Sequence, residues 1–225
     1  MTTQVKFASN AGGQLEGALA EPAGTGKVGA LVVLQEWHGI NEQMKGKVDR
    51  FAKEGYLALA PDLYHGKVAA NDEEAGKLMG QLDWGKAVHE IADAVAYLRG
   101  HARSNGKVGV VGFCMGGALS LAASRHVEKL ACAVPFYGVP QMPLDEFARV
   151  KTPIQAHFAK NDDWAKASIA EQIQEKVRSG GGHMDLFVYD AGHAFMREGD
   201  PAHYDAAAAK LAWPRALEFL KKHLG

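Results

Sequence analysis

One junction constrains the fold of this chain most: the apolar run 107–111 passes directly into 112–117, which reads Gly-Phe-Cys-Met-Gly-Gly. A strand that turns at once into a helix holds its central residue in a strained backbone conformation, so the neighbours must lack clashing side chains. Gly112 and Gly116 meet that demand around Cys114. The pattern predicts a nucleophile elbow, with the thiol at a helix N-terminus whose free N–H groups favour a thiolate. The alternative is a buried, inert cysteine, which is common, so the rest of the chain decides.

From residue 30 onward, strand-like runs alternate with helical patterns, which is typical of a mostly parallel sheet with helices on both faces. The predicted strands cover 30–35, 56–60, 107–111, 130–136, 153–158 and 184–189. Ahead of them, 5–8 and 15–19 flank a turn signal and predict an antiparallel hairpin at the sheet edge. The length suits a single α/β domain over residues 1–225.

Apolar residues at helical spacing predict the helices of this domain. They cover 44–52 behind an Asn41 cap, 88–98, the stretches after Cys114 and Trp164, and a C-terminal stretch from Ala206. Pro214 lacks an N–H group, so we expect it to kink or restart the last helix. The segment 61–71 has no periodicity and follows a strand's carboxyl end, where open α/β sheets bind ligands, so we expect it to form a pocket wall.

Composition excludes several classes of partner. Lys and Arg number 25 against 26 Asp and Glu, and neither sign forms a long run, which argues against a nucleic-acid partner. The N-terminus lacks the pattern of a signal peptide and no apolar stretch is long enough for a membrane span, so we expect a cytoplasmic protein without a membrane partner. Two cysteines and scattered histidines predict neither a disulfide framework nor a metal site, and we expect no cofactor. The expected partner is a small molecule, and the chain is expected to be a monomer or weak homo-oligomer.

A thiol at an elbow needs a base, and the base needs a carboxylate to orient it. Asp162 and His193 each follow a predicted strand, so both are expected at the sheet edge where Cys114 lies. The order nucleophile, acid, histidine is that of α/β-hydrolases. We favour Asp162 over Asp163 as the acid, because Asp163 stands where the following helix favours an N-terminal carboxylate.

The cluster Gln-Glu-Trp-His-Gly at 35–39 follows another predicted strand. In this fold the loop at that place supplies one N–H group of an oxyanion hole, and Met115, the residue after the nucleophile, supplies the second. Glu36 lies one residue after an apolar run, behind Gln35, so we expect it to be partly buried and functional rather than part of a surface salt bridge.

Together these residues resemble the dienelactone hydrolase family of the α/β-hydrolase superfamily, over essentially the whole chain. The matching motifs are Gln-Glu-x-x-Gly-x-Asn at 35–41, Pro-Asp-Leu-Tyr at 61–64, Gly-x-Cys-x-Gly-Gly at 112–117, Phe-Tyr-Gly at 136–138, Asp162, and Ala-Gly-His-x-Phe-x-Arg at 191–197. The resemblance implies Cys114 as nucleophile, His193 as base and Asp162 as orienting acid. It also implies that Glu36 lies near the thiol and modulates it, and that the N–H groups of Trp37 and Met115 form the oxyanion hole.

Substrate recognition departs from the family pattern. The resemblance implies two arginines that bind a substrate carboxylate, of which Arg197 matches one, whereas 71–81 contains no arginine for the other. Lysine lacks the two-pronged geometry of arginine, so the pattern weighs against dienelactone itself as the substrate. We expect Arg197, Tyr137, Phe195 and Trp164 to contact the substrate.

The expected activity is a cysteine-dependent hydrolysis of carboxylic esters or lactones, of the carboxymethylenebutenolidase type, through an acyl-enzyme on Cys114. Two alternatives stay open: a broad carboxylesterase or thioesterase, and a non-catalytic redox-responsive thiol protein on the same fold. The set of Glu36, Asp162 and His193 argues against the second, because a redox sensor needs no oriented base.

Overall fold

An eight-stranded sheet forms the centre of the molecule, which the computed structural model describes over residues 1–225. Its strands are β1 (Thr3–Ala8), β2 (Gln14–Ala20), β3 (Val28–Leu34), β4 (Leu57–Pro61), β5 (Ser104–Phe113), β6 (Cys132–Phe136), β7 (Ile154–Asn161) and β8 (Met184–Gly192). They lie in the order β1-β2-β4-β3-β5-β6-β7-β8, and only β1–β2 and β2–β4 are antiparallel pairs. The predicted fold class is confirmed, including the antiparallel N-terminal hairpin at the edge.

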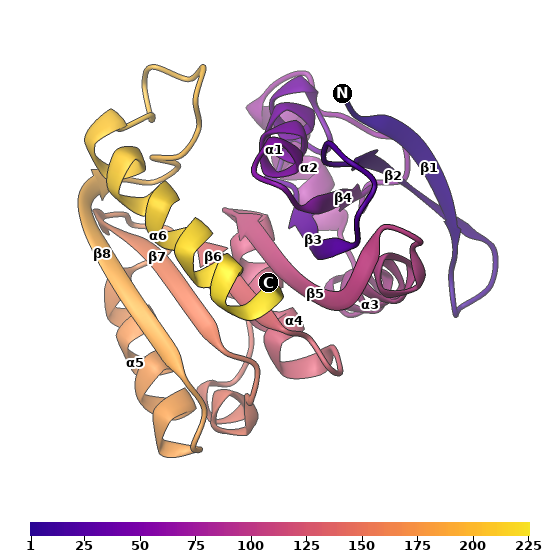
Figure 1. Cartoon of the computed structure of the whole chain (residues 1–225). Coiled ribbons are helices and arrows are strands. Elements are labelled where there is room, and N and C mark those ends of the chain that lie inside the picture. Colours follow the sequence, from indigo (N-terminus) through magenta and orange to yellow (C-terminus); the bar gives the residue numbers. More distant parts are fainter.

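Helices cover both faces of this sheet (Figure 1). They are α1 (Glu42–Lys53), α2 (Asp72–Gln81), α3 (Trp84–Gly100), α4 (Met115–His126), α5 (Ala167–Ser179) and α6 (Ala206–Leu224), with a 3₁₀ helix at Leu144–Arg149. One core cluster joins α3, α4 and α5 to one face, and a second joins α1 and α6 to the other. Because both faces are covered, β6 is buried along its whole length, and its apolar run lacks the alternation of a half-exposed strand.

The ends of the helices follow local chemistry. The Asn41 side chain accepts a hydrogen bond from the Met44 N–H at 3.0 Å, so the predicted cap of α1 is confirmed. Pro214 does not restart α6, which runs without a break from Ala206 to Leu224, and that part of the expectation is wrong. Pro214 lies on the exposed side, while Trp213 and Ala216 pack against the sheet and hold both halves in one helix.

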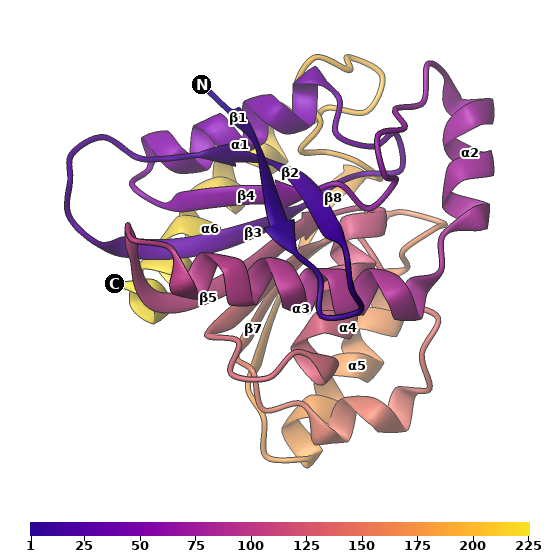
Figure 2. The ribbon, with the colours of Figure 1, turned by 90° about the vertical axis from the view of Figure 1, so that its right-hand side faces the viewer.

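The helix α2 is absent from the sequence-based prediction. Figure 2 shows it at the side of the molecule, away from the two helical layers, and Ala75 is its one buried residue. Its start nevertheless carries a sequence signal: the Asn71 side chain accepts from the Glu74 N–H at 3.0 Å, and the first turn is acidic. The helix also has an apolar stripe at helical spacing: Ala75 is buried, and Leu78 and Met79 pack against the first core cluster. The sequence-based prediction missed this short pattern.

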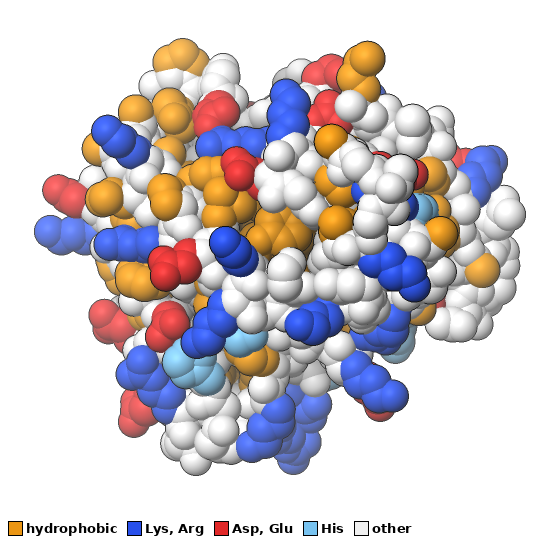
Figure 3. Space-filling model, viewed as in Figure 1, with side chains coloured by type: hydrophobic (Ala, Val, Ile, Leu, Met, Phe, Trp, Pro, Cys, Tyr) orange, Lys and Arg blue, Asp and Glu red, His pale blue; other side chains and the backbone are white.

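The surface carries charges of both signs. Figure 3 shows basic and acidic side chains on one face, with apolar side chains among them. No helix is both long and apolar enough to cross a bilayer. Both cysteines are free thiols.

Candidate active site

The nucleophile elbow predicted from the sequence is present between β5 and α4. Cys114 has φ 54° and ψ −116°. A positive φ costs conformational free energy in any residue that has a Cβ. A Cβ on Gly112 would lie 2.1 Å from the Gly116 carbonyl oxygen, and one on Gly116 would lie 2.3 Å from the Leu34 carbonyl oxygen. Only glycine permits these approaches, so the two glycines allow the turn that carries Cys114.

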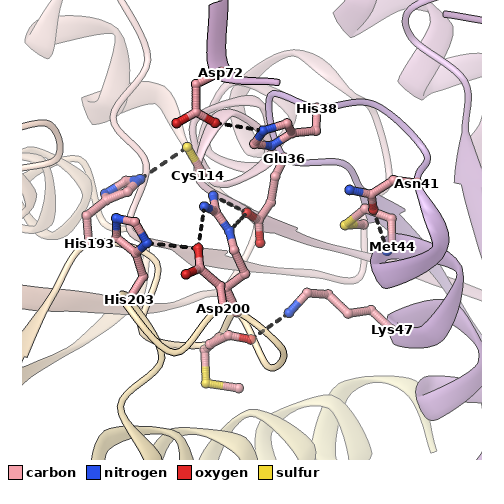
Figure 4. A network of polar contacts seen from close by, with 12 residues as sticks. Glu36, His38, Asn41, Met44, Lys47, Asp72, Cys114, His193, Asp200 and His203 are labelled. Atoms are coloured by element: carbon pink, nitrogen blue, oxygen red, sulfur yellow. Dashed lines mark hydrogen bonds and ion pairs between the residues drawn. The ribbon is translucent and has the colours of Figure 1, made fainter. Parts of the chain in front are cut away.

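Three side chains predicted to act together meet at the carboxyl edge of the sheet. His193 Nε2 lies 3.2 Å from Cys114 Sγ, and His193 Nδ1 lies 2.7 Å from Asp162 Oδ2. Figure 4 shows the thiol facing the His193 ring. The arrangement has the geometry of a nucleophile, a base and an orienting acid.

Backbone N–H groups of the following residues hold Asp162 in place, whereas Asp162 is chosen from the sequence because Asp163 is expected to cap a helix. Its Oδ1 accepts from the N–H groups of Trp164 and Ala165 at 2.8 and 2.9 Å, which leaves Oδ2 for His193. Asp163 is exposed and does not cap α5, which begins four residues later at Ala167. The capping argument is therefore wrong, although Asp162 is the carboxylate that contacts the histidine.

The surroundings of His193 favour its charged form. Burial lowers the pKa of His193, but the hydrogen bonds with Asp162 and Cys114 outweigh it and raise the pKa to about 9. Burial raises the pKa of Asp162, yet the bonds from His193 and from the Ala165 N–H hold it below its usual range. Both shifts favour an imidazolium paired with an ionised carboxylate, and the His193 ring points at the sulfur.

Glu36 is buried, as expected, with 3% of its surface exposed. Its Oε2 accepts from Arg197 Nε at 2.6 Å and lies 2.5 Å from Arg197 Nη2, whereas its Oε1 has no hydrogen-bond partner. No hydrogen bond joins Glu36 to the Cys114 thiol. In this conformation Glu36, which the resemblance implies to modulate the thiol, is paired instead with Arg197.

The N–H groups expected to form an oxyanion hole follow the carboxyl ends of β3 and β5. Met115 is the first residue of α4, where the N–H group has no partner within the helix. The Trp37 N–H donates to no backbone carbonyl of the surrounding loops. The Tyr64 hydroxyl lies 3.2 Å from Met115 Sδ, so it links the loop after β4 to the start of α4.

A cavity of about 250 Å³ opens beside the thiol. Its lining is Trp37, Asp72, Met79, Cys114, Trp164, His193, Arg197 and His203. The segment 61–71 does not line it, so the expected pocket wall is not at the thiol; Leu63, Tyr64, His65 and Lys67 of that segment line a separate cavity of about 200 Å³. Leu63 and Tyr64 turn into the core, and α2 takes the place at the cavity beside the thiol.

Two of the expected substrate contacts are also corrected. Tyr137 and Phe195 are fully buried and do not line the cavity. The two rings pack edge to face with centroids 5.1 Å apart, and Tyr137 packs in the same way on His193 at 5.2 Å. They therefore support the histidine ring from behind, whereas Trp164 and Arg197 do reach the cavity.

Near the cavity lie two histidine–aspartate contacts that sequence reasoning missed. His38 Nε2 lies 3.0 Å from Asp72 Oδ1, and His203 Nδ1 lies 2.8 Å from Asp200 Oδ2. Figure 4 shows both pairs around Cys114. The only signal for any of them is the acidic first turn after Asn71, which places Asp72 on a helix. No group of three His, Cys, Asp or Glu side chains is arranged to hold a metal ion.

Solved structures define the class of this fold. A dienelactone hydrolase-like promiscuous phosphotriesterase from metagenomic libraries matches with a TM-score of 0.88 at 20% identity, over 100% of this chain and 99% of that one. An esterase of Thermogutta terrifontis matches with a TM-score of 0.75 at 16% identity, over 98% and 94% of the two chains. The protein has the α/β-hydrolase fold.

Its family is defined by sequence. The model of the dienelactone hydrolase family matches residues 15–224. Protein usf of Aquifex pyrophilus is 34% identical over 100% of both chains, and the carboxymethylenebutenolidase of Pseudomonas putida is 33% identical over 92% of each. The chain belongs to the dienelactone hydrolase family and is a hydrolase of carboxylic ester bonds.

Proposed function

We propose that the protein is a cysteine-dependent hydrolase of small carboxylic esters or lactones, which works through an acyl-enzyme on Cys114. The proposal rests on a continuous series of contacts: His193 Nδ1 lies 2.7 Å from Asp162 Oδ2, and His193 Nε2 lies 3.2 Å from Cys114 Sγ. A thiol that served only as a redox sensor needs no carboxylate to orient the histidine beside it.

In the proposed first step, the Cys114 thiolate attacks the acyl carbon, and the carbonyl oxygen takes up the negative charge. The N–H groups of Trp37 and Met115 stabilise that oxyanion. When the bond to the leaving alkoxide breaks, His193 gives it a proton, which leaves a thioester on Cys114 and a neutral imidazole.

In the proposed second step, the neutral His193 removes a proton from water, and the hydroxide attacks the thioester. Collapse of this intermediate releases the carboxylic acid product and restores the thiolate and the imidazolium. Asp162 holds the His193 ring in one tautomer throughout. For a lactone, the alcohol and the acid leave as one molecule, because the ring joins them.

Glu36 is proposed to modulate the thiol through its charge. It lies buried beside the cavity, and its Oε1 has no hydrogen-bond donor, so the Arg197 guanidinium is its one hydrogen-bond partner. Its negative charge disfavours a second negative charge on the Cys114 sulfur.

A panel of aryl esters, enol lactones and thioesters, run on wild type and Cys114→Ala, tests the proposal. We expect turnover of esters or lactones by wild type and none by the variant, with unchanged circular dichroism. Preference for thioesters identifies a thioesterase instead. Undiminished ester turnover by Cys114→Ala contradicts the nucleophile assignment.

A further inference from the structure

The one arginine at the cavity is already engaged by carboxylates. Arg197 Nε and Nη2 contact Glu36, and Nη1 lies 3.3 Å from Asp200 Oδ2. The Arg197 side chain is 12% exposed and the Glu36 side chain 4% exposed, so the pair is shielded from water. A substrate carboxylate has to displace a buried partner before it gains a two-pronged contact with this guanidinium.

The charges around the opening are negative on balance. Apart from the triad, two cations and three carboxylates gather here. Arg197 contacts Glu36 and Asp200, the Lys47 ammonium also interacts with Glu36, and Asp72 lies beside His38. His38 and His203 each contact one of these carboxylates. With both imidazoles neutral, the three carboxylates outnumber the two cations, so the opening carries no net positive charge that attracts an anion.

The remaining walls are aromatic and apolar. The Trp37 and Trp164 rings lie with centroids 6.5 Å apart at a tilt of 58°, which forms an open corner, and Met79 of α2 lies on the same cavity. Trp164 is 76% exposed, so one indole face is free for a ligand. Indole faces bind flat apolar groups, and they attract cations through the negative face of the ring.

From the saturated arginine, the acidic rim and the indole corner, we infer that this site takes neutral or cationic esters with a flat apolar group and discriminates against substrates that carry a free carboxylate. This inference rests on the proposed ester hydrolysis and names its substrate class. It also distinguishes the chain from a site in which a guanidinium is free to bind an acid.

Three aryl acetates test the inference, with a carboxymethyl, a methoxycarbonylmethyl or a trimethylammoniomethyl group at the para position. The methylene spacer keeps the leaving-group phenols close in acidity, so charge is the main difference. We expect kcat/KM for the neutral and cationic esters to exceed that for the anionic ester about tenfold or more, the scale of one charged hydrogen bond.

The variant Asp200→Asn probes the cause. The amide keeps the Oδ1 that accepts from the Ala202 N–H, but it releases the charge held on Arg197 Nη1. The ratio of anionic to neutral kcat/KM should rise about threefold or more. Glu171→Gln, which removes the same charge from an exposed site on α5, should leave this ratio unchanged.

The ratio is measured within one preparation, so a partly folded variant does not distort it. A wild-type preference for the anionic ester, or equal rates for all three, overturns the inference, as does an unchanged ratio in Asp200→Asn. These outcomes require an active enzyme. Absence of turnover of all three esters counts instead against the proposed ester hydrolysis.

Discussion

The two cysteines of this chain lie on neighbouring strands and occupy opposite chemical situations. Cys132 begins β6 and pairs in register with Gly109 inside the sheet, where burial raises the pKa of its thiol to about 12. Cys114 follows the carboxyl end of β5, with a positive φ and a histidine 3.2 Å from its sulfur. The same side chain is a small apolar core residue in one place and a presented thiol in the other.

The difference comes from the ends of the strands. Parallel strands bring the residues that follow them to one edge, so Asp162 after β7 and His193 after β8 reach the thiol that follows β5. Cys132 lies among apolar side chains within the second core cluster, and burial alone raises the pKa of its thiol. Position in the fold, rather than the residue type, determines the surroundings of each thiol.

Replacing the two cysteines in turn should give the largest difference in activity. Cys114→Ala should lower kcat by about 10³-fold or more, because the nucleophile is lost. Cys132→Ala should keep kcat within about twofold and lower the free energy of unfolding by about 1 kcal/mol through lost packing. Steady-state kinetics and urea denaturation measure both. Loss of activity in Cys132→Ala, with a folded protein, contradicts the assignment.

The two adjacent aspartates should also differ in their effect on activity. Asp162→Asn should lower kcat by about 10²- to 10⁴-fold, because the amide favours the wrong histidine tautomer. Asp163→Asn, which alters an exposed neighbour, should stay within about threefold of wild type. If the two variants exchange these effects, the orienting acid is Asp163.

Thiol alkylation compares both cysteines in one experiment. Glu36→Gln removes a negative charge near the cavity and frees the positive charge of Arg197, so iodoacetamide should label Cys114 several-fold faster than in wild type. Cys132 is fully buried and serves as the internal control that stays unlabelled. Equal labelling rates in both proteins between pH 6 and 9 count against a role for Glu36.

The smallest expected effect is on stability. The pKa of His193 is raised to about 9 in the fold from its ordinary 6.5, so its protonated form contributes stability that is complete below pH 6.5 and is lost as the pH rises through 9. The difference in free energy of unfolding between wild type and His193→Gln should therefore shrink between pH 6.5 and 9. Urea denaturation at several pH values measures it, and a constant or growing difference is contrary to the raised pKa.

Local features of the chain were predictable because short-range chemistry determines them. The elbow at Cys114 follows from glycines whose Cβ atoms would collide with nearby carbonyl groups. The hairpin of β1 and β2 and the cap at Asn41 likewise depend on neighbouring residues. The meeting of Asp162 with His193 followed from the parallel order of strands, although the reason given for excluding Asp163 did not hold.

Features that depend on distant partners were not predictable. Glu36 and Arg197 are 161 residues apart, and neither residue type indicates that they pair with each other rather than with the thiol or a substrate. The burial of Tyr137 and Phe195 follows from packing between β6 and the segment after β8. The helix α2 is a different case: Ala75, Leu78 and Met79 lie at helical spacing, and the prediction missed this short pattern.

The central claim is that Cys114 carries the acyl group during turnover, and trapping that intermediate tests it most directly. Wild type mixed with an aryl ester and quenched in acid within milliseconds should show by peptide mass spectrometry one acyl adduct on Cys114 and none on Cys132. An adduct on another residue, or turnover without any adduct on Cys114 at the earliest times, would contradict the account.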